Sequence, residues 1–336
     1  MQQSHAPRPL PLFVELVRMV SEREPELAAK ALGGLAKYEA APRGKNRPDR
    51  QAIARIGPAT LRDCGGSGPP AVLVPSLINP PDVLDLDQSV SLADAVAAMG
   101  RHALLVDWGP ARDRTALDLG GHVSELFLRL VGELDEAPAL IGYCLGGTMA
   151  VAAANLIDVD RVATLAAPWR FSAYPQESRD SLLRLWETTK RAAQELGALP
   201  MEVLQSAFWS LDPKRTVAKF ASFAGADSES ASARRFVTLE DWANEGEPLP
   251  YPAARELIED LFGRDLPGIG EWEVGGQVMT DRLRCPLLNV TASADLITPA
   301  ATAPAGGTLQ AGSGHVGMVV GSARAKLHDA LAEFLG

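Results

Sequence analysis

A cysteine lies at the centre of a short glycine-rich segment, IGYCLGG at residues 141–147, and its surroundings are typical of a reactive nucleophile. Gly142 and Gly146 flank Cys144 in the spacing Gly-x-Cys-x-Gly, after an apolar run and before a run of helix formers. Such a strand-to-helix elbow holds its central residue in a strained backbone conformation above a sheet. The helix N-terminus favours the reactive thiolate, and the Leu145 amide would point at a substrate carbonyl oxygen. We therefore predict Cys144 as a nucleophile and the Leu145 N–H as an oxyanion donor.

The alternative for Cys144 is an ordinary buried cysteine in a tight turn, since free cysteine is among the most buried residue types. The succession of strand, elbow and helix favours the catalytic interpretation. Cys64 and Cys285 lack that context and are predicted to be inert. The cysteines form no Cys-x-x-Cys pair, so we expect no structural zinc, no other metal and no cofactor.

A thiol nucleophile needs a base, and the base needs a carboxylate that orients it. His315 lies in a glycine-flanked loop, GSGHVGMVVG, between the last predicted strand and the last predicted helix, and Asp295 directly follows that strand. The order Cys144, Asp295, His315 is the nucleophile, acid, histidine order of α/β-hydrolases. The rival acids lie in a predicted cap or before the strand: Asp212, Asp241 and Asp281. The remaining histidines are assigned to the N-terminus, a strand start and two helices: His5, His102, His122 and His328.

Short apolar runs alternate with helical stretches from about residue 52 onward, which predicts a parallel sheet covered by helices on both faces. The predicted strands are 71–75, 102–107, 139–143, 161–166 and 286–292, and the helices between them are 88–99, 115–134 and 147–157. Residues 139–157 are uncharged over a length that could span a membrane, but their glycines favour a buried strand that turns into a helix. The fold class expected is therefore α/β, with the topology of an α/β-hydrolase.

The rhythm of strands and helices breaks between residues 171 and 284, where amphipathic helices are predicted over 179–197, 200–209, 233–244 and 252–262. A helical insertion of this kind is most simply a cap over the carboxyl ends of the strands, where active sites of open α/β sheets lie. We predict an N-terminal helical extension and linker over 1–51, with a helix over 10–38 and a polar connector over 40–51. The core would then comprise 52–170 and 285–336, with the cap over 171–284 and a closing helix over 322–335.

Composition narrows the class of protein. The chain has 336 residues with 46% hydrophobic and 22% charged residues, which is close to the globular mean and excludes disordered and collagenous classes. Lys and Arg number 32 against 42 Asp and Glu, and the net charge of −10 argues against a nucleic-acid partner. Glu15 and Arg18 interrupt the apolar stretch 10–20, so no secretory segment is expected. With residues 139–157 assigned to a strand and a helix, no membrane span is expected either, and the predicted location is cytoplasmic.

With these segments in view, the chain resembles the polyhydroxyalkanoate synthase family, whose members polymerise 3-hydroxyacyl-CoA. The similarity runs from about residue 55 to the C-terminus and is greatest at the cysteine, acid and histidine segments. The segments that carry it are VPSLINPPDVLDL (74–86), LLVDWG (104–109), IGYCLGGT (141–148), ADLITP (294–299) and GSGHVGMVVG (312–321). The chain is short and resembles the class that works with a helper subunit.

The resemblance implies that Cys144 accepts the acyl group, His315 is the general base and Asp295 is its partner. The backbone at Leu77 would supply the second oxyanion donor, with Ile78, Asn79 and Tyr143 as substrate-binding residues. The implied partners are a hydroxyacyl-CoA substrate, a growing polyester or its granule, and a helper subunit or a second copy of the chain. Two alternatives stay open: a Cys-dependent thioesterase or oligoester depolymerase, and a non-catalytic granule-associated relative.

Overall fold

The structure is a computed structural model that describes residues 5–43 and 50–336. It separates into two compact units, each with its own core: residues 5–43 with Pro200–Gly246, and residues 50–199 with Glu247–Gly336. Within the predicted N-terminal extension over 1–51, residues 1–4 lie outside the described part, and so do residues 44–49 of the predicted connector.

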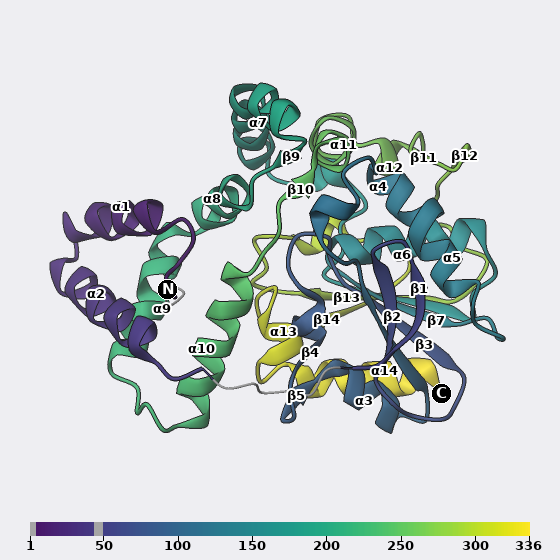
Figure 1. Cartoon of the computed structure of the whole chain (residues 1–336), viewed down its shortest axis with the longest axis horizontal. Helices are drawn as coiled ribbons and strands as arrows, with labels where there is room; N and C mark the ends of the chain where they lie inside the picture. The colour runs from purple at the N-terminus through teal and green to yellow at the C-terminus, as the bar shows by residue number, and fades with distance from the viewer. Residues whose placement is uncertain (1–4, 44–49) are drawn as a thin grey trace. The chain divides into compact units, whose positions relative to one another are not determined.

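An eight-stranded sheet forms the centre of the second unit (Figure 1). The order across the sheet is β1-β2-β6-β3-β7-β8-β13-β14, and only the pairs β1–β2 and β2–β6 are antiparallel. The strands are β1 (Ala52–Ile56), β2 (Ala59–Asp63), β3 (Pro70–Val74), β6 (His102–Asp107), β7 (Ala139–Tyr143), β8 (Arg161–Leu165), β13 (Leu287–Ala292) and β14 (Gly307–Ala311).

The five predicted strands are confirmed, because their largely apolar runs form the buried, parallel centre of the sheet. Every residue of β3 and of β7 is buried. Three strands of the sheet have no counterpart among the predicted ones: β1, β2 and β14. Strands β1 and β14 lie at the two edges of the sheet, so their residues are mostly exposed and carry no apolar run.

Helices cover both faces of this sheet. Helix α3 contacts β6, α14 contacts β14, and the two helices contact each other. Helix α6 contacts β3, β7 and β8. The helices of the unit are α3 (Leu92–Ala98), α4 (Leu119–Gly121), α5 (Leu128–Val131), α6 (Leu145–Leu156), α7 (Gln176–Leu196), α11 (Tyr251–Arg255), α12 (Leu266–Ile269), α13 (Gly317–Val320) and α14 (Arg324–Leu335), with π-helical segments at His122–Phe127 and Glu256–Gly263. The minor strands are β4 (Asp85–Asp87), β5 (Val90–Ser91), β9 (Ala198–Leu199), β10 (Leu249–Pro250), β11 (Glu273–Val274) and β12 (Gln277–Val278).

The first unit is a cluster of five helices: α1 (Leu10–Ser21), α2 (Pro25–Ala40), α8 (Met201–Leu211), α9 (Pro213–Ala224) and α10 (Ala231–Asn244). Aromatic rings fill its core, and the rings of Phe13 and Phe220 meet edge to face at 4.7 Å. The single helix predicted over 10–38 is wrong. The chain breaks after Ser21 because Pro25 cannot donate the backbone hydrogen bond that a continuous helix needs, and it starts α2 instead.

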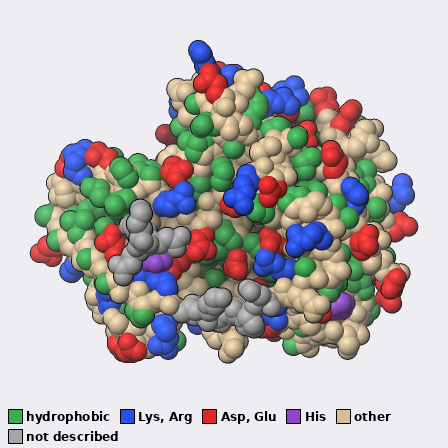
Figure 2. All heavy atoms as spheres, viewed as in Figure 1, with side chains coloured by type: hydrophobic (Ala, Val, Ile, Leu, Met, Phe, Trp, Pro, Cys, Tyr) green, Lys and Arg blue, Asp and Glu red, His purple; other side chains and the backbone are tan. Residues whose placement is uncertain are grey.

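The predicted domain division stays a prediction, and the compact units follow different boundaries. Of the predicted cap over 171–284, residues 200–246 group with the N-terminal helices, and 171–199 and 247–284 group with the sheet. The two ends of the 200–246 segment are joined within the sheet unit, where Leu199 of β9 pairs with Leu249 of β10. Figure 2 shows acidic and basic side chains interspersed over the face that is viewed.

Candidate active site

Cys144 occupies the turn between β7 and α6, with a backbone conformation that residues other than glycine seldom adopt. Its φ is 55° and its ψ is −130°. Such a conformation costs about 1–3 kcal/mol and persists only where the surroundings impose it. The Cys144 N–H donates to Leu165 O at 2.9 Å, and the Gly147 N–H donates to Cys144 O at 2.9 Å. The predicted elbow is therefore present, with a half-buried thiol at the N-terminus of a helix of 12 residues.

The first turn of α6 lies directly against the end of β3. A Cβ atom placed on Gly146 would lie 2.1 Å from Val74 O and 2.5 Å from Pro75 O, distances that no real side chain shows. Glycine at this position therefore lets the N-terminus of α6 approach the loop that follows β3. This contact holds the Leu145 N–H and the backbone at Leu77 on neighbouring segments.

We expect Gly146→Ala to lower the stability of the protein by about 2–4 kcal/mol, because the atoms that a methyl group would meet belong to the backbone and must be displaced. Gly33→Ala is the matched control: nothing lies within 4 Å of the position that its methyl group would take, and Gly33 is in α2. The control should gain up to about 1 kcal/mol, because alanine favours helix. Thermal unfolding of both variants measures the difference, and an unchanged melting temperature for Gly146→Ala would contradict the close approach.

His315 and Asp295 form a hydrogen-bonded pair beside the elbow. The His315 Nδ1 lies 2.7 Å from Asp295 Oδ2 and 3.0 Å from Thr298 Oγ1. The Thr298 hydroxyl donates to Asp295 Oδ2 at 2.8 Å, and the N–H groups of Ile297 and Thr298 donate to Asp295 Oδ1 at 2.8 and 2.9 Å. Since the carboxylate only accepts, Nδ1 carries a proton, and Nε2 is left to face the nucleophile.

The charges of Cys144, His315 and Asp295 shift the pKa values of the histidine and the carboxylate. Burial of the ring lowers the pKa of His315, but the charge of Cys144 and the hydrogen bonds to Asp295 and Cys144 outweigh it and raise the pKa to about 10. Burial raises the pKa of Asp295, yet the hydrogen bonds and charge of His315, together with Thr298, leave that pKa below its ordinary value. The imidazolium form of His315 is therefore favoured when Cys144 is a thiolate and Asp295 a carboxylate.

Tyr143 precedes the cysteine and packs its ring against His315 at 5.1 Å between ring centres. Its hydroxyl is buried and has no hydrogen-bond partner among the described residues. Burial, followed by the charges of Cys144 and Asp295, raises the pKa of Tyr143 well above 10. The same three causes raise the pKa of Tyr174, which places a second neutral phenol in this environment.

The loop after β3 holds three other residues predicted to belong to the site. Leu77 and Ile78 are buried, with exposures of 2% and 7%, and Asn79 is half-buried. Each of the three lies in the unit of Cys144 and His315. Their expected contacts with substrate stay predictions.

The rival acids have other partners. Asp281 accepts from Arg170 and from the Ala305 N–H, both at 2.7 Å. Asp212 caps α9, and Asp241 accepts from Tyr38 in the helical unit. Within residues 5–43 and 50–336, no cluster of three or more His, Cys, Asp or Glu side chains could hold a metal ion. No helix in the same ranges has the length and apolar character needed to cross a membrane.

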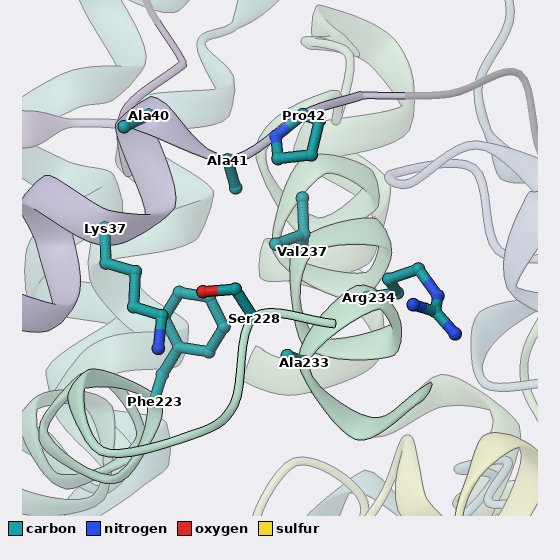
Figure 3. A pocket seen from close by; sticks show the side chains of 9 residues that line it. All are labelled: Lys37, Ala40, Ala41, Pro42, Phe223, Ser228, Ala233, Arg234 and Val237. Atoms are coloured by element: carbon teal, nitrogen blue, oxygen red, sulfur yellow. The ribbon is translucent and has the colours of Figure 1, made fainter. Parts of the chain in front are cut away.

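A pocket of about 190 Å³ in the helical unit offers no comparable chemistry (Figure 3). Lys37 extends beside the Phe223 ring and already donates to Ala226 O, while Arg234 is directed away from the pocket and donates to Glu229 O. Both cations therefore already donate to backbone carbonyl groups, one just after α9 and the other just before α10.

Thr298 is a member of the site that was not predicted from the sequence, although it lies in the same segment as Asp295, ADLITP. Its hydroxyl contacts both the acid and the histidine. The available signal was the spacing Asp-x-x-Thr, which lets a threonine hydroxyl return to the carboxylate three residues earlier.

The topology of the sheet and the position of the elbow define the α/β-hydrolase fold, as the sequence predicted. A solved carboxylesterase of the ammonia-oxidizing thaumarchaeon Nitrososphaera gargenis has the same fold, with a TM-score of 0.51 at 15% identity over 85% of this chain and 97% of the esterase. No protein-family model matches the chain.

At the level of sequence, the chain is similar to proteins named poly(3-hydroxyalkanoate) polymerase subunit PhaC, so the predicted resemblance is confirmed. It is 28% identical over 278 residues to the subunit of Haloferax mediterranei, covering 75% of this chain and 55% of the relative. It is 27% identical over 289 residues to the subunit of Allochromatium vinosum, covering 79% of this chain and 80% of the relative. The chain thus spans about half the length of the Haloferax relative.

Proposed function

We propose that the chain is an acyltransferase that polymerises 3-hydroxyacyl-CoA through Cys144, His315 and Asp295 and a covalent acyl-cysteine. The observation that carries this proposal is the cysteine at a strained elbow beside a histidine that is hydrogen-bonded to a carboxylate. The similarity to poly(3-hydroxyalkanoate) polymerase subunits over three quarters of the chain supports the choice of substrate.

In the first half of the reaction, Cys144 Sγ attacks the thioester carbonyl carbon of the hydroxyacyl-CoA. The carbonyl oxygen becomes negative in the transition state, and the N–H groups of Leu145 and Leu77 are the proposed donors to it. The bond between the acyl carbon and the CoA sulfur breaks, and the leaving thiolate takes the proton of the His315 imidazolium. One thioester replaces another, so the step changes the free energy little.

Acylation converts His315 from an acid to a base. Burial lowers the pKa of this ring, and the charge of Cys144 is the largest of the contributions that raise it. An acylated Cys144 carries no charge, so the pKa of His315 falls once CoA has left. The neutral Nε2 then takes the proton of a 3-hydroxyl group, whose oxygen attacks the acyl carbon. An ester forms, the Cys144 thiolate leaves and the imidazolium is restored.

The proposed surroundings follow from the same chemistry. The residues that would contact the acyl group are Ile78, Asn79 and Tyr143, since the first two follow Leu77 in the loop after β3 and Tyr143 packs against His315. The relatives are named as subunits of a polymerase, which supports a helper subunit or a second copy of this chain as partner. A cytoplasmic location at the surface of a polyester granule is part of this proposal.

The proposal is tested by intact mass spectrometry after brief exposure to 3-hydroxybutyryl-CoA, with free CoA followed in parallel. A ladder of adducts that differ by one hydroxybutyryl unit, absent from Cys144→Ala, is the expected result. CoA release with at most one transient adduct would replace polymerisation by hydrolysis, because water would then accept the acyl group. If no adduct forms and no CoA is released, a non-catalytic role for the chain on its own would be favoured instead.

A further inference from the structure

The loop that carries the Leu77 N–H is held by side chains from other segments. The Trp108 indole donates to Pro75 O at 3.1 Å, and the Arg114 guanidinium donates to Leu77 O at 3.4 Å. These two carbonyl groups belong to the peptide units on either side of the Ser76–Leu77 peptide. The unit between them bears the Leu77 N–H, which has no acceptor within residues 5–43 and 50–336.

A third contact continues this arrangement along the loop. The Glu247 N–H donates to Ile78 O at 2.9 Å, and the Glu247 carboxylate accepts from the Ala111 N–H. Glu247 thus joins the loop after β3 to the segment that follows β6, where Trp108 and Arg114 lie. The carbonyl groups of the loop are fixed, and a free N–H remains between them.

Arg114 is buried in a way that is costly for a cation. It is 4% exposed, burial lowers its pKa to about 10, and its carboxylate neighbour Glu247 lies 4.0 Å away. Its other hydrogen bonds run to Gly109 O at 3.2 Å and to His122 Nε2 at 3.1 Å. A buried cation without a close carboxylate is a poor stabilising device, since desolvation outweighs what the weak pair returns.

His122 is arranged to accept from this guanidinium. Its Nδ1 lies 2.6 Å from Asp118 O, which can only accept, so Nδ1 carries the proton. The unprotonated Nε2 is then the acceptor for Arg114. Burial, helped by the charge of Arg114, lowers the pKa of His122 to about 4, so the ring is neutral at physiological pH. The Arg114 guanidinium is thereby oriented by two acceptors, His122 Nε2 and Leu77 O.

We infer that Arg114 and Trp108 are positioning residues: they fix the carbonyl groups of Leu77 and Pro75 so that the Leu77 N–H stays aimed at the oxygen that becomes negative when Cys144 attacks. This inference rests on the proposed acyl transfer. It adds that the second oxyanion donor is oriented by a network that does not touch substrate, formed by the buried side chains of Arg114, Trp108 and His122 and the half-buried Glu247.

Two reactions of the same thiol separate positioning from general damage. Acylation by 3-hydroxybutyryl-CoA develops negative charge on a carbonyl oxygen. Alkylation by iodoacetamide displaces iodide at a saturated carbon and does not. We expect Arg114→Met to slow the acylation burst, measured as CoA released in the first turnover, by about 10- to 100-fold. Iodoacetamide alkylation of Cys144 should stay within about twofold of the wild-type rate, because no oxyanion donor takes part in it.

Trp108→Phe gives a milder test if Arg114→Met fails to fold, since it removes the indole donor and keeps an aromatic ring. It should show the same split with a smaller loss of acylation. Arg101→Met is the matched control, because Arg101 is also buried and donates to Leu335 O and to Asp160, on other segments of the chain. This control should lower the melting temperature and leave both rates unchanged.

The outcomes are distinct. Acylation and alkylation slowed in proportion would show general damage to the site and overturn the inference. If Cys144 is acylated equally fast in the wild type and in the variants, the inference is overturned and the proposed function stands. A wild-type protein that is alkylated but not acylated would overturn the proposed function and this inference with it.

Discussion

In the Cys144→Ala variant, release of CoA from 3-hydroxybutyryl-CoA is expected to fall by about 10⁴-fold or more, with no acyl adduct on the protein. The loss is large because the proposed chemistry passes through a bond to Sγ, and no other thiol of the chain has the same surroundings. Burial raises the pKa of Cys285, which keeps that thiol in its unreactive form at neutral pH. CoA release and intact mass, measured together, test the prediction.

The same variant should keep its fold. Alanine can adopt the conformation at φ 55° at no greater cost than cysteine, and the thiol that is removed is only half-buried. The melting temperature should therefore move by no more than a few degrees, corresponding to about 1 kcal/mol. A large fall in melting temperature would assign Cys144 a structural role instead.

Cys285→Ala and Cys144→Ser are the matched controls. Cys285→Ala removes a thiol of similar exposure just before β13 and should leave CoA release unchanged. Cys144→Ser keeps the size of the side chain at the elbow, but a serine hydroxyl is far less acidic than a thiol and does not form a comparable anion beside His315. Its activity should fall almost as far as that of Cys144→Ala. Retention of a few per cent of wild-type CoA release by Cys144→Ala would contradict the acyl-cysteine mechanism.

The central strands and the elbow could be predicted from the sequence because local patterns determine them. Strand β7 is an uninterrupted apolar run, and the glycines around Cys144 mark the point where that strand turns into a helix. The order of Cys144, Asp295 and His315 along the chain then selected one acid and one base among several. The pair His315 and Asp295 does lie within hydrogen-bond distance.

Features that depend on contacts between distant segments left no local pattern. Arg114 donates to Leu77 O across 37 positions of sequence, and Glu247 meets Ile78 from beyond the whole 200–246 segment. An isolated arginine or glutamate in a loop is most simply a solvent-exposed charge, so neither residue was selected. The edge strand β14 was missed for a related reason, because four of its five residues are not buried.

Local sequence patterns also could not predict which helices group together in each compact unit. Residues 200–246 have the same amphipathic character as 179–197, which is why one cap over 171–284 was predicted. Their apolar faces pack on α1 and α2 through contacts such as Phe13 with Trp209, at 6.2 Å between ring centres. The shapes and volumes of the side chains decide which helices pack against each other, and a hydrophobic pattern in the sequence contains neither.

The second large effect is expected for His315→Gln, in which CoA release should fall by about 10³- to 10⁴-fold. The variant loses the proton donor to the CoA thiolate and the base for the incoming hydroxyl group. Glutamine can still hydrogen-bond to Asp295 and Thr298, so the fold should persist. A His315→Gln variant with near-native turnover would show that another residue is the base.

The pH dependence of alkylation tests the charge of His315 apart from turnover. Its pKa is raised from 6.5 to about 10, so the imidazolium persists beside Cys144 from acidic pH through neutrality and is lost only as the pH passes about 10. At pH 7 the wild type should therefore react with iodoacetamide about 10- to 30-fold faster than His315→Gln, because an ordinary thiol is only a few per cent ionised at that pH. Near pH 10 the ratio should approach one, since an ordinary thiol is then ionised without help.

His102→Gln is the matched control for this profile. His102 also faces a carboxylate, with Nε2 at 3.1 Å from Asp63 Oδ1, but it lies at the start of β6, whereas Cys144 follows the end of β7. Its loss should leave the rate at Cys144 unchanged at every pH. If His315→Gln and the wild type gave the same alkylation profile, the imidazolium would not be activating the thiol. The transfer of charge from Cys144 to His315, on which the proposed switch from acid to base depends, would then have to be abandoned.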